Sequence, residues 1–186
     1  MSATTDRPAF PSGGADALPA RLALKSPDAP RGLLDGAWWP RSRELSRELP
    51  ALAAALDLLW GRITRVAVNP RYWPVVPRKV PVGRRVIKVG WFAAELDPHM
   101  LLLLSFRVGR WDLLVIPPET GAHSAERLMA AARDASGPPR TASALMANET
   151  AHPAHPELLT VWEDEGGAVP SEHPRAGRHH EQRDLA

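Results

Sequence analysis

The sequence predicts a single α+β domain: a curved antiparallel sheet of about six strands, curling toward a partial barrel, packed with two or three helices. Several short segments between residues 21 and 116 alternate apolar and polar residues, or are apolar throughout, as strands do. One long segment, residues 42–61, spaces its leucines at helical intervals instead. The order of these segments is typical of an antiparallel sheet with its helices on one side.

The first two predicted strands form a hairpin. Residues 21–25 (RLALK) and 32–39 (GLLDGAWW) flank the turn-rich link SPDAPR. Trp38 and Trp39 end the second strand, where neighbouring side chains point to opposite faces of a sheet. One tryptophan is therefore expected under the helix that follows, and the other on the far side of the sheet. A half-exposed Trp39 that stacks on a ligand is the functional alternative.

The helix that follows is predicted from a leucine stripe. Its apolar residues recur at spacings of four and three, which places them on one face: Leu45, Leu49, Leu52, Leu56 and Leu59. Ser42 is the expected N-cap and Gly61 the expected C-cap. Pro50 interrupts the stripe, because proline removes a backbone hydrogen bond and clashes with the preceding turn. We therefore expect a kink or two abutting helices at this position.

The remaining strands differ in how they are buried. Residues 63–69 (ITRVAVN) and 85–92 (RVIKVGWF) alternate, with Arg65 and Lys88 opposite apolar positions. Residues 100–106 (MLLLLSF) and 112–116 (DLLVI) are apolar on both faces, which predicts a central hairpin covered from both sides. Further helices are expected over residues 120–134 and 142–148.

The two ends of the chain, residues 1–20 and 149–186, are predicted to be disordered tails around a core domain of residues 21–148. Both ends lack apolar periodicity and are rich in proline, together with glycine or histidine. The chain has no cysteine, no apolar leader and no apolar run long enough to span a membrane. These features favour a cytoplasmic protein without a membrane partner.

Sequence motifs of known chemistry are missing: there is no GxxxxGK[ST], GxGxxG, GxSxG or HExxH pattern. His99 and His123 are the core histidines that titrate near neutral pH, and we assign neither a catalytic role. The histidines of the C-terminal tail lack the folded frame that a structural zinc site needs. The sequence therefore predicts no catalytic residues, no metal and no cofactor.

One region of the core is strongly basic. Residues 58–94 contain eight Arg and Lys side chains and no Asp or Glu. Within it, the proline-punctuated segment NPRYWPVVPRKVPVGRR is predicted as an extended surface loop. Basic groups beside accessible aromatic rings suit an anionic partner. The candidate binding residues are Trp39, Arg71, Tyr72, Trp73, Arg78, Lys79 and Arg84. The alternative is a solvated face produced by GC-rich codon bias, with Trp73 clamping the loop onto the core.

The C-terminal tail has the opposite charge. Residues 149–186 carry eight acidic and three Arg side chains, a net charge of minus five, against plus two for the whole chain. Three partners fit the basic region: an acidic protein, single-stranded nucleic acid, or the chain's own tail held nearby by its tether. We interpret the protein as a non-enzymatic binding or regulatory module with a basic, aromatic-containing surface. A small-molecule pocket inside the curled sheet and an enzyme with an unrecognised site are the alternatives.

Several strings of the core resemble one known family. They are RLALKSPDAPRGLLDGAWWPRSREL, NPRYWPVVPRKV, VGWFAAELDPH and GRWDLLVIPPETG, followed by RLM and TASALM. In this order, over residues 21–146, they are similar to DUF5994, an actinobacterial family of unknown function. The resemblance implies an actinobacterial source with a GC-rich genome, and it brings no catalytic or binding residues with it.

Overall fold

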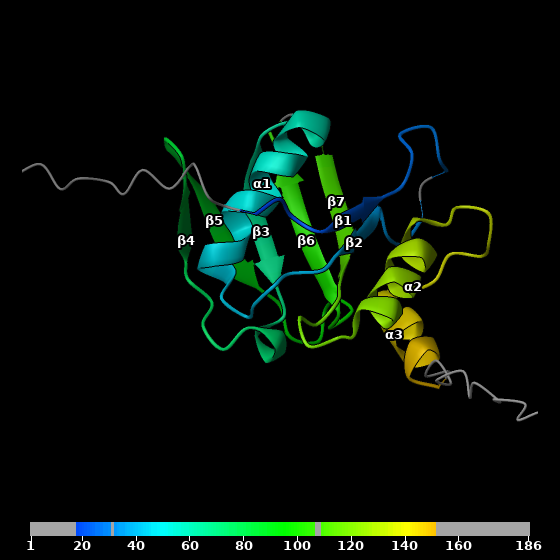
Figure 1. The fold of residues 1–186 in the computed structure, drawn as a ribbon. Helices are drawn as coiled ribbons and strands as arrows, with labels where there is room; N and C mark the ends of the chain where they lie inside the picture. Colours follow the sequence, from blue (N-terminus) through cyan, green and yellow to red (C-terminus); the bar gives the residue numbers. More distant parts are fainter. Residues whose placement is uncertain (1–17, 31, 107–108, 152–186) are drawn as a thin grey trace, which may run out of the picture. The chain divides into compact units, whose positions relative to one another are not determined.

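The computed structural model describes residues 18–30, 32–106 and 109–151, which form a mixed α+β fold around one seven-stranded sheet (Figure 1). The strands are β1 (Leu22–Leu24), β2 (Gly36–Trp38), β3 (Ile63–Val68), β4 (Lys79–Val82), β5 (Arg85–Trp91), β6 (Met100–Ser105) and β7 (Gly109–Val115). The helices are α1 (Leu45–Trp60), α2 (Ala122–Arg133) and α3 (Ala142–Ala151), with a 3-10 turn η1 (Pro70–Tyr72). Within these residues the sheet stays open, in the order β1-β2-β7-β6-β3-β5-β4, so the predicted partial barrel does not close.

Both predicted hairpins are confirmed. Strands β1 and β2 pair antiparallel, as do β6 and β7. In the first hairpin, Gly36 has a φ of 155°, and a Cβ added to it would lie 2.3 Å from the carbonyl oxygen of Ala23. Glycine is therefore required at this position for β1 to approach β2 so closely.

The wholly antiparallel sheet was wrong, because β2 pairs parallel with β7 and β3 pairs parallel with β5. The second parallel pair arises from β4, which the sequence had suggested was part of a surface loop. After β3 the chain crosses to the edge of the sheet and forms β4, then returns in β5 beside β3. Pro81 does not prevent this strand, since an edge strand can leave one side of its backbone unpaired.

Helix α1 packs across one face of the sheet. Its leucines Leu49, Leu52 and Leu56 are fully buried against side chains from β3, β5, β6 and β7. The helix runs without a break from Leu45 to Trp60 although Pro50 lies inside it, so the prediction of two abutting helices was wrong. It begins after Glu44, while the Ser42 hydroxyl donates to the Glu48 carboxylate at 2.8 Å.

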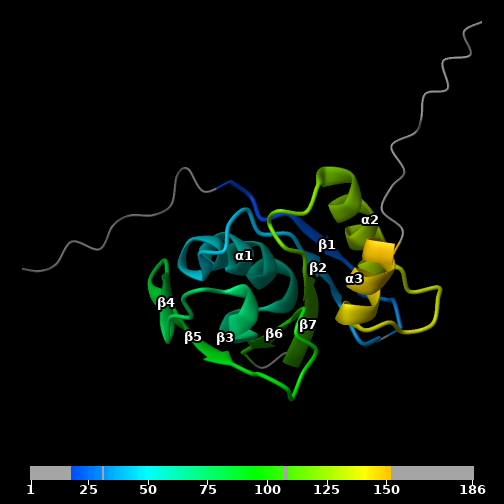
Figure 2. The same cartoon turned by 90° about the horizontal axis from the view of Figure 1, so that it is seen from below.

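Helices α2 and α3 pack on the opposite face, which corrects the prediction that all helices lie on one side. Alternation along β7 shows this directly: Leu113 and Val115 belong to the core under α1, while Leu114 belongs to a second core under α2 and α3. Both helices lie over the edge of the sheet that is formed by β1, β2 and β7 (Figure 2). The same face of β3, β4 and β5 is left largely exposed.

The adjacent tryptophans divide between the two faces, as predicted. Trp38 is 1% exposed in the core under α1, where its ring stacks on Trp73 at a centroid distance of 5.6 Å. Trp39 is half-buried and packs against the second core. The pair therefore joins the two halves of the hydrophobic interior at the point where β2 ends.

Candidate anion-binding face

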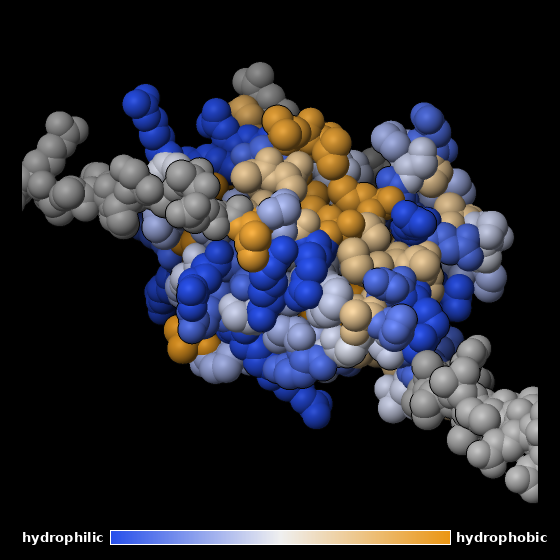
Figure 3. Space-filling view, viewed as in Figure 1, coloured by the Kyte–Doolittle hydropathy of each residue, from blue (hydrophilic) through white to orange (hydrophobic). Residues whose placement is uncertain are grey.

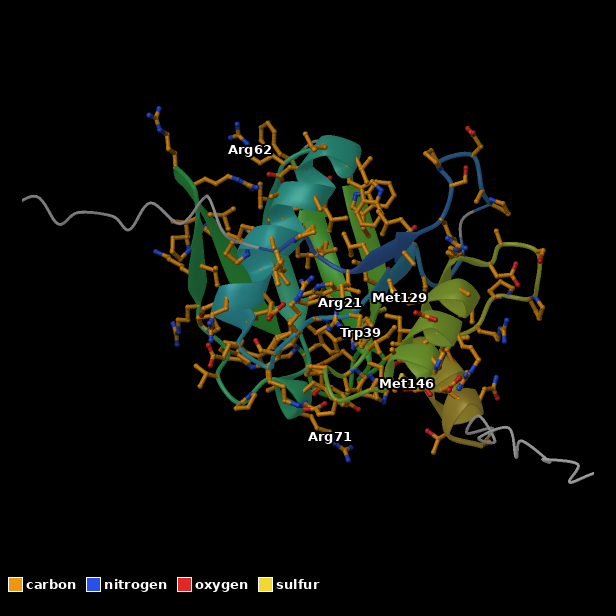
Figure 4. The ribbon with its side chains drawn as sticks, viewed as in Figure 1. Arg21, Trp39, Arg62, Arg71, Met129 and Met146 are labelled. Atoms are coloured by element: carbon orange, nitrogen blue, oxygen red, sulfur yellow. The ribbon has the colours of Figure 1, made fainter. Side chains whose placement is uncertain are left out.

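The residues nominated from the sequence do not form one surface. Trp39, Arg71, Tyr72 and Trp73 lie at the end of the sheet where β2 and β3 finish, whereas Arg84 lies in the β4–β5 turn at the other end. Figure 4 shows this separation between Arg71, after β3, and Arg62, before β3. Arg78 and Lys79 lie between these ends, at the start of β4.

The nominated aromatic rings are engaged within the protein. Trp73 is 3% exposed because it stacks on Trp38, so its ring is closed to a ligand. The guanidinium of Arg21 lies 3.4 Å from the centre of the Trp39 ring and donates to the Trp39 carbonyl at 2.9 Å (Figure 4). The Tyr72 hydroxyl is hydrogen-bonded to His99 Nε2 at 2.9 Å. None of the three rings offers an open stacking platform in this arrangement.

The pairing register instead brings a different set of basic side chains into line. Lys79 lies directly opposite Lys88, and Lys88 lies directly opposite Arg65. Arg65 faces Leu104 on β6, and Leu104 faces Arg110 on β7. We call Arg65, Lys79, Lys88 and Arg110 the cationic row. It crosses five strands, a span of about 19 Å at the usual strand spacing of roughly 4.8 Å.

The cationic row lies on the face of the sheet that α1 does not cover. Val66 and Val89, the next residues along β3 and β5, are 2% and 6% exposed in the core under α1. Because successive side chains of a strand point to opposite faces, Arg65 and Lys88 point away from that core. All four members of the row are exposed, and the next row toward the end of β3 contains Gly90, Ala67 and Leu102. The surface beside the charges is thus formed by small or apolar residues on β5, β3 and β6, and by the Asp112 carboxylate on β7, which lies opposite Leu102.

The electrostatics of the row are unbalanced. Arg110 donates to the Asp112 carboxylate at 3.0 Å. Arg65, Lys79 and Lys88 form no ion pair with any residue of the described segments. Like charges directly opposite each other destabilise a sheet by some tenths of a kcal/mol per pair, as a rough estimate. A bound anion would remove this repulsion, which makes the row a favourable place for negative charge.

His99 lies directly before β6 and is half-buried. Burial lowers its pKa; Asp97 opposes this effect, and Arg71 adds to it. His99 Nδ1 is buried and has no hydrogen-bond partner among the described residues. Asp97 is not a triad partner for this ring, because its carboxylate accepts from the backbone N–H of His99 and from the N–H and hydroxyl of Ser143. The contacts of the Asp97 carboxylate therefore fix the start of α3 and do not orient the His99 imidazole.

Two other features of the described segments bear on function. No group of three or more His, Asp or Glu side chains there is placed to hold a metal ion. None of the helices in that part of the chain has the length and apolar character to cross a membrane. Figure 3 shows a hydrophobic region at the C-terminal end of α1, where Leu58 and Leu59 are 88% and 66% exposed. That region is on the α1 side and is separate from the cationic row.

The comparison with known families gives one match. Residues 21–132 match the family described as "Family of unknown function (DUF5994)". The chain belongs to the DUF5994 family. The DUF5994 region contains the whole sheet, α1 and nearly all of α2, so it includes the cationic row, while α3 lies outside it. No curated protein and no solved structure matches the chain significantly.

Of the row, the sequence had nominated Lys79 alone. Arg65 and Lys88 could be recognised as lying opposite the buried positions of their own strands, because each stands alone in an alternating segment. What could not be read was the pairing of β3 with β5, which makes them neighbours. Arg110 gave no signal, since it precedes the apolar part of β7 and resembled a turn residue.

Proposed function

We propose that this DUF5994 chain is a binding module that holds an acidic segment of a partner protein on the cationic row. The observation that carries the proposal is the register of β4, β5, β3, β6 and β7, which aligns four cationic side chains on an exposed sheet face. Three of these side chains have no internal counter-ion in the described segments. An acidic polypeptide would supply several carboxylates to the row at once.

The neighbours of the row favour an acidic polypeptide over single-stranded nucleic acid. Binding of single strands usually combines a basic groove with aromatic rings that stack on the bases. On the side toward the end of β3, the residues directly beside the row are Gly90, Ala67, Leu102 and Asp112, and none of them has an aromatic ring. The exposed Trp91 lies on the opposite side of β5 from Lys88, by alternation along the strand. The row therefore offers charge without stacking.

The test is fluorescence anisotropy with two labelled probes of equal charge, a glutamate-rich peptide and an oligothymidylate, at low and at moderate salt. Arg65→Glu, Lys79→Glu and Lys88→Glu together should weaken peptide binding at least tenfold. The matched control reverses Arg41, Arg47 and Arg133, which are also exposed, lie outside the strands of the row and change the net charge by the same amount. The control should keep peptide affinity within about threefold, because net charge is screened over a Debye length of about 10 Å.

Three outcomes contradict the proposal. If neither probe binds at low salt, the row is a solvated face. If both triple variants weaken binding equally, net charge and not the row is responsible. If the oligothymidylate binds tenfold more tightly than the peptide, the partner is a nucleic acid.

Two further expectations belong to this proposal. A cytoplasmic location and an actinobacterial source remain predictions from the composition and the family resemblance. The alternative of a ligand pocket inside the curled sheet is less favoured, because the buried leucines of α1 fill that side. An enzyme with an unrecognised site remains the other alternative.

A further inference from the structure

A separate pocket lies between two connections that are distant in the sequence. The β1–β2 connection and the α2–α3 connection run side by side, as Figures 1 and 2 show, and enclose a volume of about 240 Å³. Its floor is apolar: Leu34, Ala132 and Leu145 are each 3% exposed. An apolar cavity of roughly 150 Å³ is large enough for benzene, so this pocket has room for a ring or a short chain with a polar head.

Among the described residues, the rim of the pocket carries two cations and one carboxylate: Lys25, Arg140 and Asp134. Asp134 is already engaged, because its Oδ1 accepts from the Ser136 N–H at 2.9 Å and from the Ser136 hydroxyl at 2.6 Å. Lys25 and Arg140 form no ion pair with any residue in the described part of the chain. The pKa of Asp134 is lowered by the Ser136 hydrogen bonds and also by Arg140 and Lys25, so the carboxylate stays charged and the three side chains leave the described rim with one positive charge in excess.

The Lys25 ammonium lies close to the backbone of Gly32. A Cβ added to Gly32 would lie 2.7 Å from Lys25 Nζ, closer than real Cβ contacts allow. Because this ammonium is the far end of a flexible side chain, the contact places Lys25 at the edge of the apolar floor without fixing it there. A lysine held at such an edge presents its charge to the pocket and its methylene groups to the protein.

We propose that this pocket binds a small carboxylic acid with an apolar body. The carboxylate lies between Lys25 and Arg140, and the apolar body rests on Leu34, Ala132 and Leu145. A cationic ligand is disfavoured by the two rim cations. A larger ligand is disfavoured by the volume. This site is independent of the cationic row, and Asp134, Arg140 and Leu145 lie beyond the region that matches the family.

The experiment is a titration of the ¹⁵N-labelled full-length chain with benzoate, followed by amide chemical shifts, with benzyl alcohol as the neutral probe of similar shape. Benzoate should cause saturable shifts in the amides of Gly32, Leu33, Ala135 and Gly137, with a dissociation constant on the order of 1 mM, as expected for a ligand of this size. Benzyl alcohol should bind at least fivefold more weakly. Lys25→Met with Arg140→Gln should weaken benzoate binding at least fivefold. Arg47→Gln with Arg133→Gln also removes two charges and is the matched control that should not weaken it.

Each other outcome overturns the proposal in a defined way. Equal binding of benzoate and benzyl alcohol would remove the carboxylate assignment. Absence of saturable shifts at these amides, with folded spectra, would remove the pocket as a binding site. Benzoate shifts confined to β3 and β5 would show that the anion binds the cationic row instead. The Arg65, Lys79 and Lys88 triple variant distinguishes the two proposals, since it should lose the acidic peptide and keep benzoate.

Discussion

Replacing Trp38 by alanine tests the packing account of the two adjacent tryptophans. The side chain is 1% exposed, and tryptophan buries roughly 150–250 Å². At about 25 cal/mol per Å² this transfer alone is worth about 4–6 kcal/mol. Measured costs of Trp→Ala in cores are roughly 3–5 kcal/mol, and the stacked contact with Trp73 contributes about 0.5–1.5 kcal/mol beyond its area. We therefore expect Trp38→Ala to lower the free energy of unfolding by about 4–5 kcal/mol.

Trp39 provides the matched comparison from the next position in the chain. It is half-buried, so its removal should cost about half as much, roughly 2 kcal/mol, including the contact with Arg21. The assay is urea unfolding followed by far-ultraviolet circular dichroism, because tryptophan fluorescence itself changes with the substitution. The total free energy of unfolding of a domain is about 5–15 kcal/mol, so the loss in Trp38→Ala can be large enough to unfold the protein. Trp38→Phe, which keeps a ring against Trp73, should then cost less than half as much and remain measurable.

Two results would refute the reasoning. A loss below about 1 kcal/mol for Trp38→Ala would mean that the indole contributes little buried area, against its observed exposure. A larger loss for Trp39→Ala than for Trp38→Ala would mean that the second core, not the one under α1, limits stability. A double-mutant cycle with Trp73→Ala should give a coupling of about 0.5–1.5 kcal/mol, and additive costs would remove the stacking term.

Three further predictions follow from single features. The pKa of His99 is lowered in the folded protein, so the unfolded chain binds a proton at this side chain more readily. The urea midpoint should therefore fall as the pH drops below about 6.5, and His99→Gln should reduce this pH dependence. The same pH dependence in His99→Gln would contradict the prediction. Pro50→Ala should raise the free energy of unfolding by about 1–3 kcal/mol, measured by thermal melts, because it restores an α1 hydrogen bond. An unchanged melting temperature would show that α1 accommodates the proline without loss. A chain that ends at residue 151 lacks residues 152–186, which have a net charge of minus four. It should bind the glutamate-rich peptide several-fold more tightly than the full chain at low salt, because the tethered acidic segment no longer competes. Equal affinities would exclude this competition.

Much of the fold could be predicted because local patterns are strong in this chain. The leucine stripe of α1, except for the exposed Leu59, the alternation in β3 and β5 and the apolar runs of β6 and β7 each report burial of their own segment. The split of Trp38 and Trp39 followed from the same alternation. Strand β4 was missed because its four residues contain Pro81 and lack an apolar run, so its identity depends on pairing with β5.

The site was harder to predict because it depends on which strands are neighbours. Lys79 and Lys88 are separated by a turn and could be paired from a hairpin. Arg65 reaches them only because β4 occupies the edge and leaves β5 beside β3. The basic region of the sequence also contains Arg71 and Arg84, which carry the same charge as the row but lie at opposite ends of the strands. Composition therefore located the charge, and register decided which charges act together.

The lysines of the chain argue against codon bias as the whole explanation of its basic surface. Twenty of the 23 basic residues are arginine, as expected where GC-rich codons are favoured, since lysine codons are AT-rich. Bias alone would leave the few lysines at arbitrary surface positions. Instead, Lys79 and Lys88 are adjacent members of the cationic row, and Lys25 lies at the rim of the pocket between the β1–β2 and α2–α3 connections. Lysine carries a compact, strongly hydrated ammonium on a flexible stem, whereas arginine presents a planar fork of donors. Replacing all three by arginine keeps every charge, and a loss of peptide or benzoate affinity in that variant would show that shape as well as charge was retained there.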